Sequence, residues 1–151
     1  AQARNMWVIR ESVAPASRAE GPGLSYDISV SISKIPTFIE KGIKASLDIL
    51  PSIRPYPLGH IGDGNLHFSF MGPKGMDRET LKQYSPAITR AVNDLVTSMA
   101  GSISAEHGIG IDKIDELAHY RSKVELDTMR SIKRALDPKN IMNPGKILRL
   151  S

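Results

Sequence analysis

The chain has 151 residues with 40% hydrophobic and 24% charged side chains, the composition of a soluble globular domain with enough apolar residues to bury a core. The absence of cysteine excludes disulfides, thiolate metal sites and a cysteine nucleophile. The net charge of +4 comes from scattered basic residues, which disfavours a nucleic-acid partner, and there is neither a signal-peptide pattern nor an apolar run near the roughly 18 residues of a membrane span.

The first half of the chain alternates predicted helices and strands. Apolar spacing predicts a helix over 4–14, a strand over 26–32, a helix over 34–50 and two hairpin arms over 52–61 and 65–71. Pro15 is expected to stop the first helix, and Ser33 to cap the second. Pro55 and Pro57 indicate that the first hairpin arm is an edge strand or an irregular approach to the hairpin.

The second half predicts helices over 77–99 and 122–136, a short strand over 102–105, a tight loop over 106–110 and an irregular tail over 140–146. Pro86 is expected to split the long helix, with Ser85 capping its second part. Ser122 and Glu125 have the spacing of a capping box. The strand and helix order is β-α-β-β-α-β, so we predict an α+β, ferredoxin-like antiparallel sheet with helices packed on one face.

Two histidines flank the glycine-rich stretch 59–64. His60 and His67 are seven positions apart; the glycines disfavour a helix, and an odd separation along a straight strand would place the rings on opposite faces. Asp63 and Gly64 form a favoured two-residue turn, around which His60 would lie directly opposite His67 on one face. The same register pairs Ile61 with Leu66 and Gly62 with Asn65. The histidines would then share a metal ion, or be ordinary polar residues on the solvated face.

Glu106 offers a third metal ligand. Zn²⁺ or Mn²⁺ would accept two neutral imidazoles and a carboxylate and leave positions open for a substrate. Asp63 is a rival carboxylate, but the tip of a hairpin is poorly placed to reach back. His119 lies in a polar helical stretch and is expected to be a surface residue. The candidate metal site is therefore His60, His67 and Glu106.

Three stretches, 59–67, 104–110 and 136–146, resemble in order the three motifs of the C-terminal domain of FAD-linked oxidases. The pattern is nearest to the D-2-hydroxyglutarate and D-lactate dehydrogenases and the FAD subunit of glycolate oxidase, and the similarity covers nearly the whole chain. It implies one substrate- and metal-binding domain over 1–151, with the family's N-terminal FAD-binding domain outside this chain. Because the chain opens at Ala1, we expect a piece of a longer protein.

The resemblance also implies the chemistry. In that family two histidines and a glutamate bind a divalent metal, usually zinc, and they match His60, His67 and Glu106. The next histidine, His107, would contact the substrate hydroxyl and act as the base. The implied reaction is the oxidation of a (D)-2-hydroxy acid to the 2-oxo acid by metal-assisted hydride transfer to flavin.

Further residues match the family's substrate and flavin contacts. Arg10 corresponds to the arginine that pairs with the substrate carboxylate, and Asn143 to an asparagine near the flavin. Ser69 stands where the hydroxyglutarate enzymes have a substrate-contacting asparagine, while Ser25 and Ala14 replace a lysine and a threonine. The loss of these polar groups weakens the case for a second carboxylate on the substrate, so we predict a 2-hydroxy acid without specifying hydroxyglutarate.

Two other hypotheses are a stand-alone metal-dependent hydrolase with an activated water and a non-catalytic binding module with structural histidines. Flavin absorbance of the full-length protein distinguishes the oxidase from both of these hypotheses. Metal analysis distinguishes the hydrolase from the binding module. The expected partners are FAD, a divalent metal such as zinc, a 2-hydroxy acid and the FAD-binding domain of the same protein. We also expect a homodimer, located in the cytoplasm or, in a eukaryote, in the mitochondrial matrix. The isolated chain is expected to be inactive, because it has no phosphate-cradling glycine loop.

Overall fold

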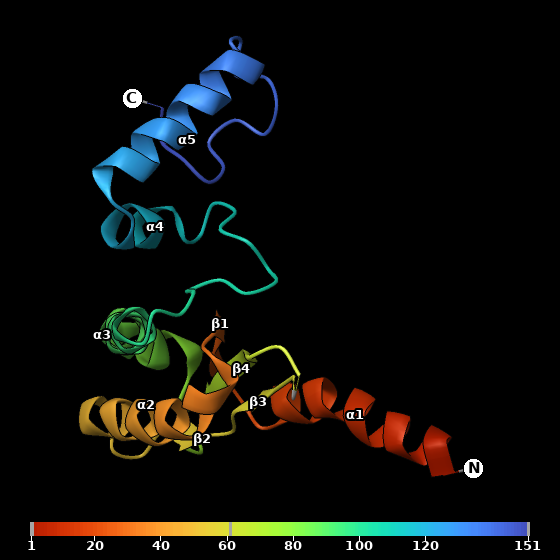
Figure 1. The fold of residues 1–151 in the computed structure, drawn as a ribbon. Helices are drawn as coiled ribbons and strands as arrows, with labels where there is room; N and C mark the ends of the chain where they lie inside the picture. Colours follow the sequence, from red (N-terminus) through yellow and green to blue (C-terminus); the bar gives the residue numbers. More distant parts are fainter. Residues whose placement is uncertain (1, 61, 151) are drawn as a thin grey trace. The chain divides into compact units, whose positions relative to one another are not determined.

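Figure 1 shows the chain as a computed structural model, which describes residues 2–60 and 62–150. The chain divides into two compact units, Ala1–Glu106 and His107–Ser151. The first unit combines helices with a small sheet. Its elements are α1 (Gln2–Ala19), β1 (Gly23–Ser29), the 3-10 turn η1 (Ile32–Lys34), α2 (Ile35–Ile49), β2 (Arg54–Pro55), β3 (Leu58–Gly59), β4 (Asn65–Met71) and α3 (Arg78–Ser98).

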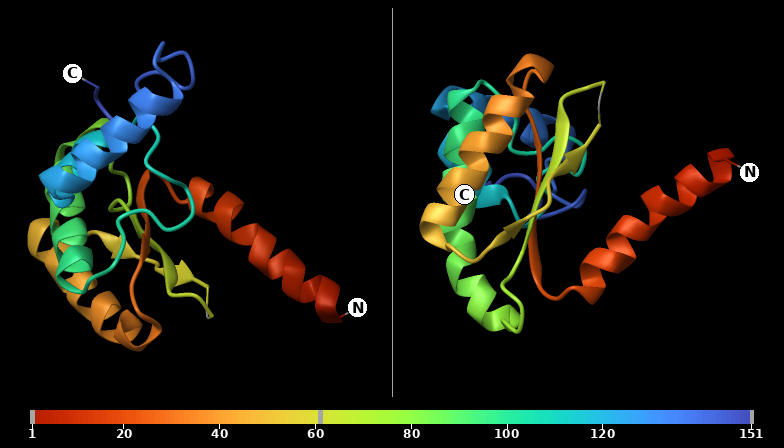
Figure 2. Two further views of the ribbon diagram at one scale, coloured as in Figure 1. Left: turned by 45° about the horizontal axis from the view of Figure 1, so that its top comes forward. Right: turned by 90° about the horizontal axis from the view of Figure 1, so that it is seen from below.

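The strands form one antiparallel sheet around β4. β1 pairs with one side of β4, and the short strands β2 and β3 pair with its other side. An antiparallel bridge between Ser29 and Ser102 places the chain after α3 beside the end of β1. α2 and α3 lie together on one face of the sheet in both views of Figure 2. This order is that of a ferredoxin-like fold, so the predicted α+β class is confirmed.

The core lies between the sheet and the two helices. Alternation along β4 points every second side chain at the helices, where the Phe38 and Phe68 rings meet edge to face with centroids 5.0 Å apart. Gly42 in α2 allows this approach, because a Cβ there would lie 2.7 Å from Phe68 Cζ. The buried apolar side chains include Ile28, Phe38, Leu66, Phe68, Phe70, Leu81, Ile88, Val92 and Val96. The opposite face of the sheet carries Ser25, Asp27, His67 and Ser69, with Met71 at its end.

The histidine hairpin forms, but its predicted register is wrong by two positions. Leu58, not His60, lies opposite His67, and the His60 N–H donates to Asn65 O at 3.0 Å. The loop is longer because Asp63 Oδ1 accepts the Asn65 N–H at 2.9 Å, which forms a turn of its own. The two-residue shift preserves the face, since side chains alternate with a period of two. The predicted partner of Leu66, Ile61, lies outside the described residues.

Gly64 ties this loop to the rest of the sheet. Its carbonyl accepts the Val30 N–H at 3.1 Å, and its φ of +80° lies in the left-handed region that glycine tolerates. A Cβ at Gly64 would lie 2.2 Å from Val30 O. The glycine therefore permits a close backbone contact that the two-residue turn prediction did not include.

Two predicted helix breaks are wrong. α1 continues through Pro15 to Ala19, and α3 runs as a single helix through Pro86. A proline inside a helix removes one backbone hydrogen bond, and that cost is smallest where water can solvate the freed carbonyl. In α1 the freed carbonyl belongs to Glu11, which is exposed. In α3, burial of Leu81 and Ile88 on either side of Pro86 stabilises the continuous helix.

Several boundaries also differ from the predictions. β1 begins and ends three residues earlier than expected, and the predicted strand 102–105 is reduced to the bridge at Ser102. Ser33 lies inside η1 and does not cap α2, whose N-cap is Lys34. Here the Lys34 N–H donates to Ser31 O at 2.7 Å and closes the tight turn before the helix. β4 has its predicted bounds, and the first hairpin arm is broken into β2 and β3, as its prolines indicated.

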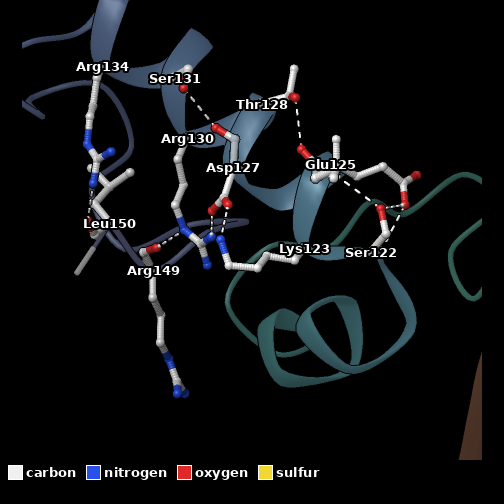
Figure 3. Close-up of polar contacts among 11 residues, drawn as sticks. Ser122, Lys123, Glu125, Asp127, Thr128, Arg130, Ser131, Arg134, Arg149 and Leu150 are labelled. Atoms are coloured by element: carbon white, nitrogen blue, oxygen red, sulfur yellow. Dashed lines mark hydrogen bonds and ion pairs between the residues drawn. The ribbon is translucent and has the colours of Figure 1, made fainter.

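The second unit holds α4 (Ile114–Tyr120), α5 (Lys123–Leu136) and an irregular tail. The predicted capping box is present: Ser122 Oγ accepts the Glu125 N–H, and the Glu125 carboxylate accepts the Ser122 N–H at 3.0 Å (Figure 3). The tail runs back along α5, where Arg130 and Arg134 donate to backbone carbonyls at its end. None of the described helices is both long and apolar enough to cross a membrane.

Candidate functional site

The sheet face that points away from α2 and α3 carries a row of polar pairs. Ser25 lies opposite Ser69, and Asp27 lies opposite His67 on the neighbouring strand. The two serine hydroxyls are 2.8 Å apart. Asp27 and Ser69 are buried, at 4% and 3% exposure, although both are polar. Buried polar groups persist where they are hydrogen-bonded, so this face has a built polar arrangement and is not plain solvated surface.

The loop after α3 reaches this row through the bridge at Ser102. Ser29 and Ser102 exchange backbone hydrogen bonds of 3.0 and 2.9 Å, and the antiparallel direction then carries the chain back along β1 toward Asp27. There Asp27 Oδ2 accepts the backbone N–H groups of Ala105 and Glu106, at 3.0 and 2.9 Å. Hydrogen bonds to a carboxylate are stronger than neutral ones, so Asp27 holds this turn against the sheet.

The held turn places Glu106 beside His67. Their Oε1 and Nε2 atoms are 3.2 Å apart, and one ligand atom each from Asp27, His67 and Glu106 lie within 4.8 Å of one another. Two carboxylates and an imidazole are donors that divalent zinc or manganese accepts. The donor set therefore fits the predicted metal, with Asp27 as an oxygen that sequence reasoning missed.

His60 lies next to this group. Its ring centroid is 5.4 Å from that of His67, so the two predicted histidine ligands face the same side of the sheet despite the changed register. His60 Nδ1 contacts Asp63 Oδ2 at 3.3 Å within the hairpin loop, and Asp63 does not belong to the group of possible metal ligands around His67. The Asn65 N–H, and after it His60, lower the pKa of Asp63 below its usual value.

The other predicted residues come from four different segments of the chain. His107 follows Glu106 directly in the chain, is exposed and begins the second unit. Arg10 lies on exposed α1, with its Cζ 6.0 Å from the centre of the Trp7 ring. Ser69 is in the polar row against Ser25, where its hydroxyl already has a hydrogen-bond partner.

Asn143 lies in the irregular tail of the second unit. Its φ of +51° is left-handed, a conformation that asparagine tolerates better than most residues. It lines a cleft of about 380 Å³ between α5 and the tail, whose walls are mainly apolar side chains such as Ile132, Leu136 and Met142. Its polar lining includes the amide side chains of Asn140 and Asn143.

The family comparison agrees with the three motifs. Residues 1–147 match the model of the C-terminal domain of FAD-linked oxidases. The chain is 37% identical to a D-2-hydroxyglutarate dehydrogenase from Stutzerimonas stutzeri, over 97% of this chain and 31% of that protein. It is 35% identical to the mitochondrial D-2-hydroxyglutarate dehydrogenase of Arabidopsis thaliana, over 97% of this chain and 25% of that protein.

A third relative has a different substrate in its name. The chain is 32% identical to a probable mitochondrial D-lactate dehydrogenase of Danio rerio, over 97% of this chain and 29% of that protein. The chain thus spans between a quarter and a third of the length of these relatives. With its motifs, fold and whole-length match, the chain belongs to the family of FAD-linked oxidase C-terminal domains.

Proposed function

We propose that this chain is the substrate- and metal-binding part of an FAD-dependent oxidoreductase that converts a (D)-2-hydroxy acid to the 2-oxo acid. The observation that carries the proposal is the contact of His67 with Glu106, 3.2 Å apart although they come from separate motifs. Family membership supports the FAD requirement, with most flavin contacts supplied by an FAD-binding domain of the same protein. The names of the Arabidopsis and zebrafish relatives support a mitochondrial location if the source is a eukaryote.

His67 and Glu106, with His60 at their side, would hold a divalent cation such as zinc on the polar face of the sheet. When bound, the cation would lower the pKa of the substrate hydroxyl as a Lewis acid, and FAD would supply the hydride acceptor. Glu106 contributes the negative charge that two neutral imidazoles lack. The half-buried position of His67 limits competition from water for its Nε2 atom.

The remaining roles fall to His107 and Arg10. His107 accepts the proton of the substrate hydroxyl as the general base. Arg10 pairs with the substrate carboxylate through its planar guanidinium, which can donate two parallel hydrogen bonds. Its exposed position on α1 leaves the guanidinium accessible to a ligand.

The polar row supports a substrate with one carboxylate. The hydroxyls of Ser25 and Ser69 are 2.8 Å apart and satisfy one another, and both side chains are short and neutral. A second carboxylate at this end of the row would find no cation from either residue. We therefore infer that a monocarboxylic 2-hydroxy acid such as D-lactate is a better substrate than D-2-hydroxyglutarate.

The test compares His67→Ala with His119→Ala in the full-length protein. His119 is an exposed histidine on α4, so its removal controls for the loss of an imidazole. We expect His67→Ala to lose bound metal and turnover of D-lactate with a dye acceptor, while His119→Ala keeps both. A full-length wild type without flavin, or with normal turnover after His67→Ala, would refute the proposal. The isolated 151-residue chain is expected to bind no stoichiometric FAD.

A further inference from the structure

The proposed function assigns no role to Asp27, although its carboxylate is only 4% exposed and lies in the polar row beside His67. We propose that Asp27 is a positioning residue that orients the turn bearing Glu106, and through it the metal site. The effect of Asp27 on metal binding rests on the proposed function. The hydrogen bonds between Asp27 and the turn are observed independently of that function.

The geometry shows how one side chain can position the turn. Asp27 Oδ2 accepts from two consecutive peptide groups, the N–H of Ala105 at 3.0 Å and that of Glu106 at 2.9 Å. Two bonds to one oxygen fix both the distance and the rotation of this backbone segment. Asp27 itself is held by its place in β1, directly opposite His67. The carboxylate therefore ties the backbone of one metal ligand to the strand pair that holds the other.

The backbone of Glu106 belongs to no helix or strand, so no helical or sheet ladder fixes it. The residue is exposed and lies in an irregular bend, two positions before Gly108, whose φ is +73°. A long side chain on a free turn would lose considerable entropy when it binds a cation. With its peptide N–H fixed by Asp27, Glu106 has only its side-chain torsions left to order. The contact of Glu106 with His67 at 3.2 Å is consistent with this preorganisation.

Direct ligation by Asp27 is the competing explanation, because its ligand atom belongs to the same 4.8 Å group as those of His67 and Glu106. The two roles differ in how the residues couple. A positioning residue acts through Glu106, so its effect on metal affinity disappears once Glu106 is removed. An independent ligand would contribute a separate factor that multiplies with the loss of Glu106.

The experiment measures Zn²⁺ affinity by chelator competition on the full-length protein, for Asp27→Ala, Asp27→Asn, Glu106→Ala and the double variant Asp27→Ala/Glu106→Ala. We expect Asp27→Ala to weaken zinc binding by about 10–100-fold, the range for groups that orient metal ligands. Asp27→Asn should stay within about threefold of the wild type, because its amide oxygen still accepts N–H groups. In the Glu106→Ala background, Asp27→Ala should change the affinity less than about twofold. Multiplying effects, or an Asn variant as weak as the Ala variant, would overturn the proposal.

Amide hydrogen exchange tests the anchor without any metal. The amides of residues 105–106 should exchange at least about tenfold faster in Asp27→Ala than in the wild type, as expected when a protecting acceptor is lost. Asp137→Ala is the matched control, since Asp137 is equally buried and accepts two backbone N–H groups in the second unit. It should leave both zinc affinity and the exchange of 105–106 unchanged. Equal exchange in the wild type and Asp27→Ala would overturn the anchor. A wild type that binds no zinc would instead refute the proposed function, with exchange still deciding the anchor.

Discussion

Two loops, one in each unit, are held by the same device. Asp27 is 4% exposed and Asp137 5% exposed. Each accepts two consecutive backbone N–H groups, from residues 105–106 and 141–142 respectively, and in both loops the distances are 3.0 and 2.9 Å. In each case the next residue along the chain is a predicted functional one, His107 or Asn143. In both loops, therefore, a buried carboxylate accepts the two backbone N–H groups that directly precede a predicted functional residue.

The two anchors differ in how far apart their partners lie in the sequence. Asp137 reaches four and five residues ahead, whereas the donors to Asp27 are 78 and 79 residues away. A local anchor forms as soon as the helix end forms, but a distant one requires the sheet and the loop to be in place. Asp137 also has the ammonium of Lys133 beside it, one helical turn earlier. The second loop is thus stabilised locally, and the first depends on the fold of the whole unit.

The largest expected effect concerns the residue that follows the Asp27 anchor. In the full-length protein His107→Ala should lower kcat by about 10²–10⁴-fold, because the side chain is proposed to take the hydroxyl proton. Bound metal should be retained, since His107 is not one of the assigned ligands. The measurements are kcat, metal content and melting temperature on one preparation. His119→Ala is the control and should keep a wild-type kcat. A folded His107→Ala protein with near-normal kcat would remove the proposed base.

A smaller effect is expected from Arg10, which lies outside both loops. Arg10→Lys keeps the charge but loses the planar pair of donors, so it should raise KM by about tenfold, as expected for the loss of roughly 1.4 kcal/mol of ground-state binding. Because neither anchor is touched, kcat should stay near the wild-type value. Arg4→Lys is a matched change on the same exposed helix and should alter neither constant. A fall in kcat at constant KM would contradict the assigned role of Arg10.

The contrast between the anchors also explains which features the sequence predicts. The capping box at Ser122 and the strand β4 depend on neighbouring residues and were predicted correctly. The hairpin loop differs from the prediction through the local Asp63–Asn65 turn and through the bond of Gly64 to Val30, more than thirty positions earlier in the chain, which no local pattern indicates. Asp27 was missed for the same reason, since nothing near it in the sequence identifies its distant donors. Its one local signal was a charged residue within an otherwise half-buried strand.

The local anchor should be sensitive to acid. Lys133 first, and then the Met142 and Ile141 N–H groups, hold the pKa of Asp137 below its usual value. The ionised form is thus favoured in the folded state, so its stabilisation is present above an ordinary carboxyl pKa of about 4 and is lost as the pH falls through the lowered value. Asp137→Asn should lower the melting temperature at pH 7, and the difference from the wild type should shrink toward pH 3.

The control for this titration is Asp127→Asn on the same helix. Asp127 also pairs with basic side chains, Lys123 at 2.6 Å and Arg130 at 2.9 Å, but its carboxylate is about half exposed. An exposed ion pair contributes little to stability, so Asp127→Asn should have the smaller effect at pH 7. Equal effects of the two variants would mean that the burial of Asp137 and its backbone donors add nothing to the loop.

The smallest expected effect concerns Asn143, which follows the Asp137 anchor as His107 follows Asp27. Asn143 has a left-handed backbone with φ of +51°, so an alanine there would add strain, whereas Asn143→Gly removes only the amide side chain. Asn140→Gly is a close control, because Asn140 lies in the same loop with φ of +48° and has no assigned flavin contact. Asn143→Gly should weaken FAD binding to the full-length protein by about threefold, as expected for one hydrogen bond among the many made by the FAD-binding domain. Asn140→Gly should leave FAD binding unchanged. If both variants weaken FAD binding equally, the cause is the greater flexibility of a loop with an added glycine and not the loss of the Asn143 amide. The two anchored loops would then resemble one another in structure but not in function.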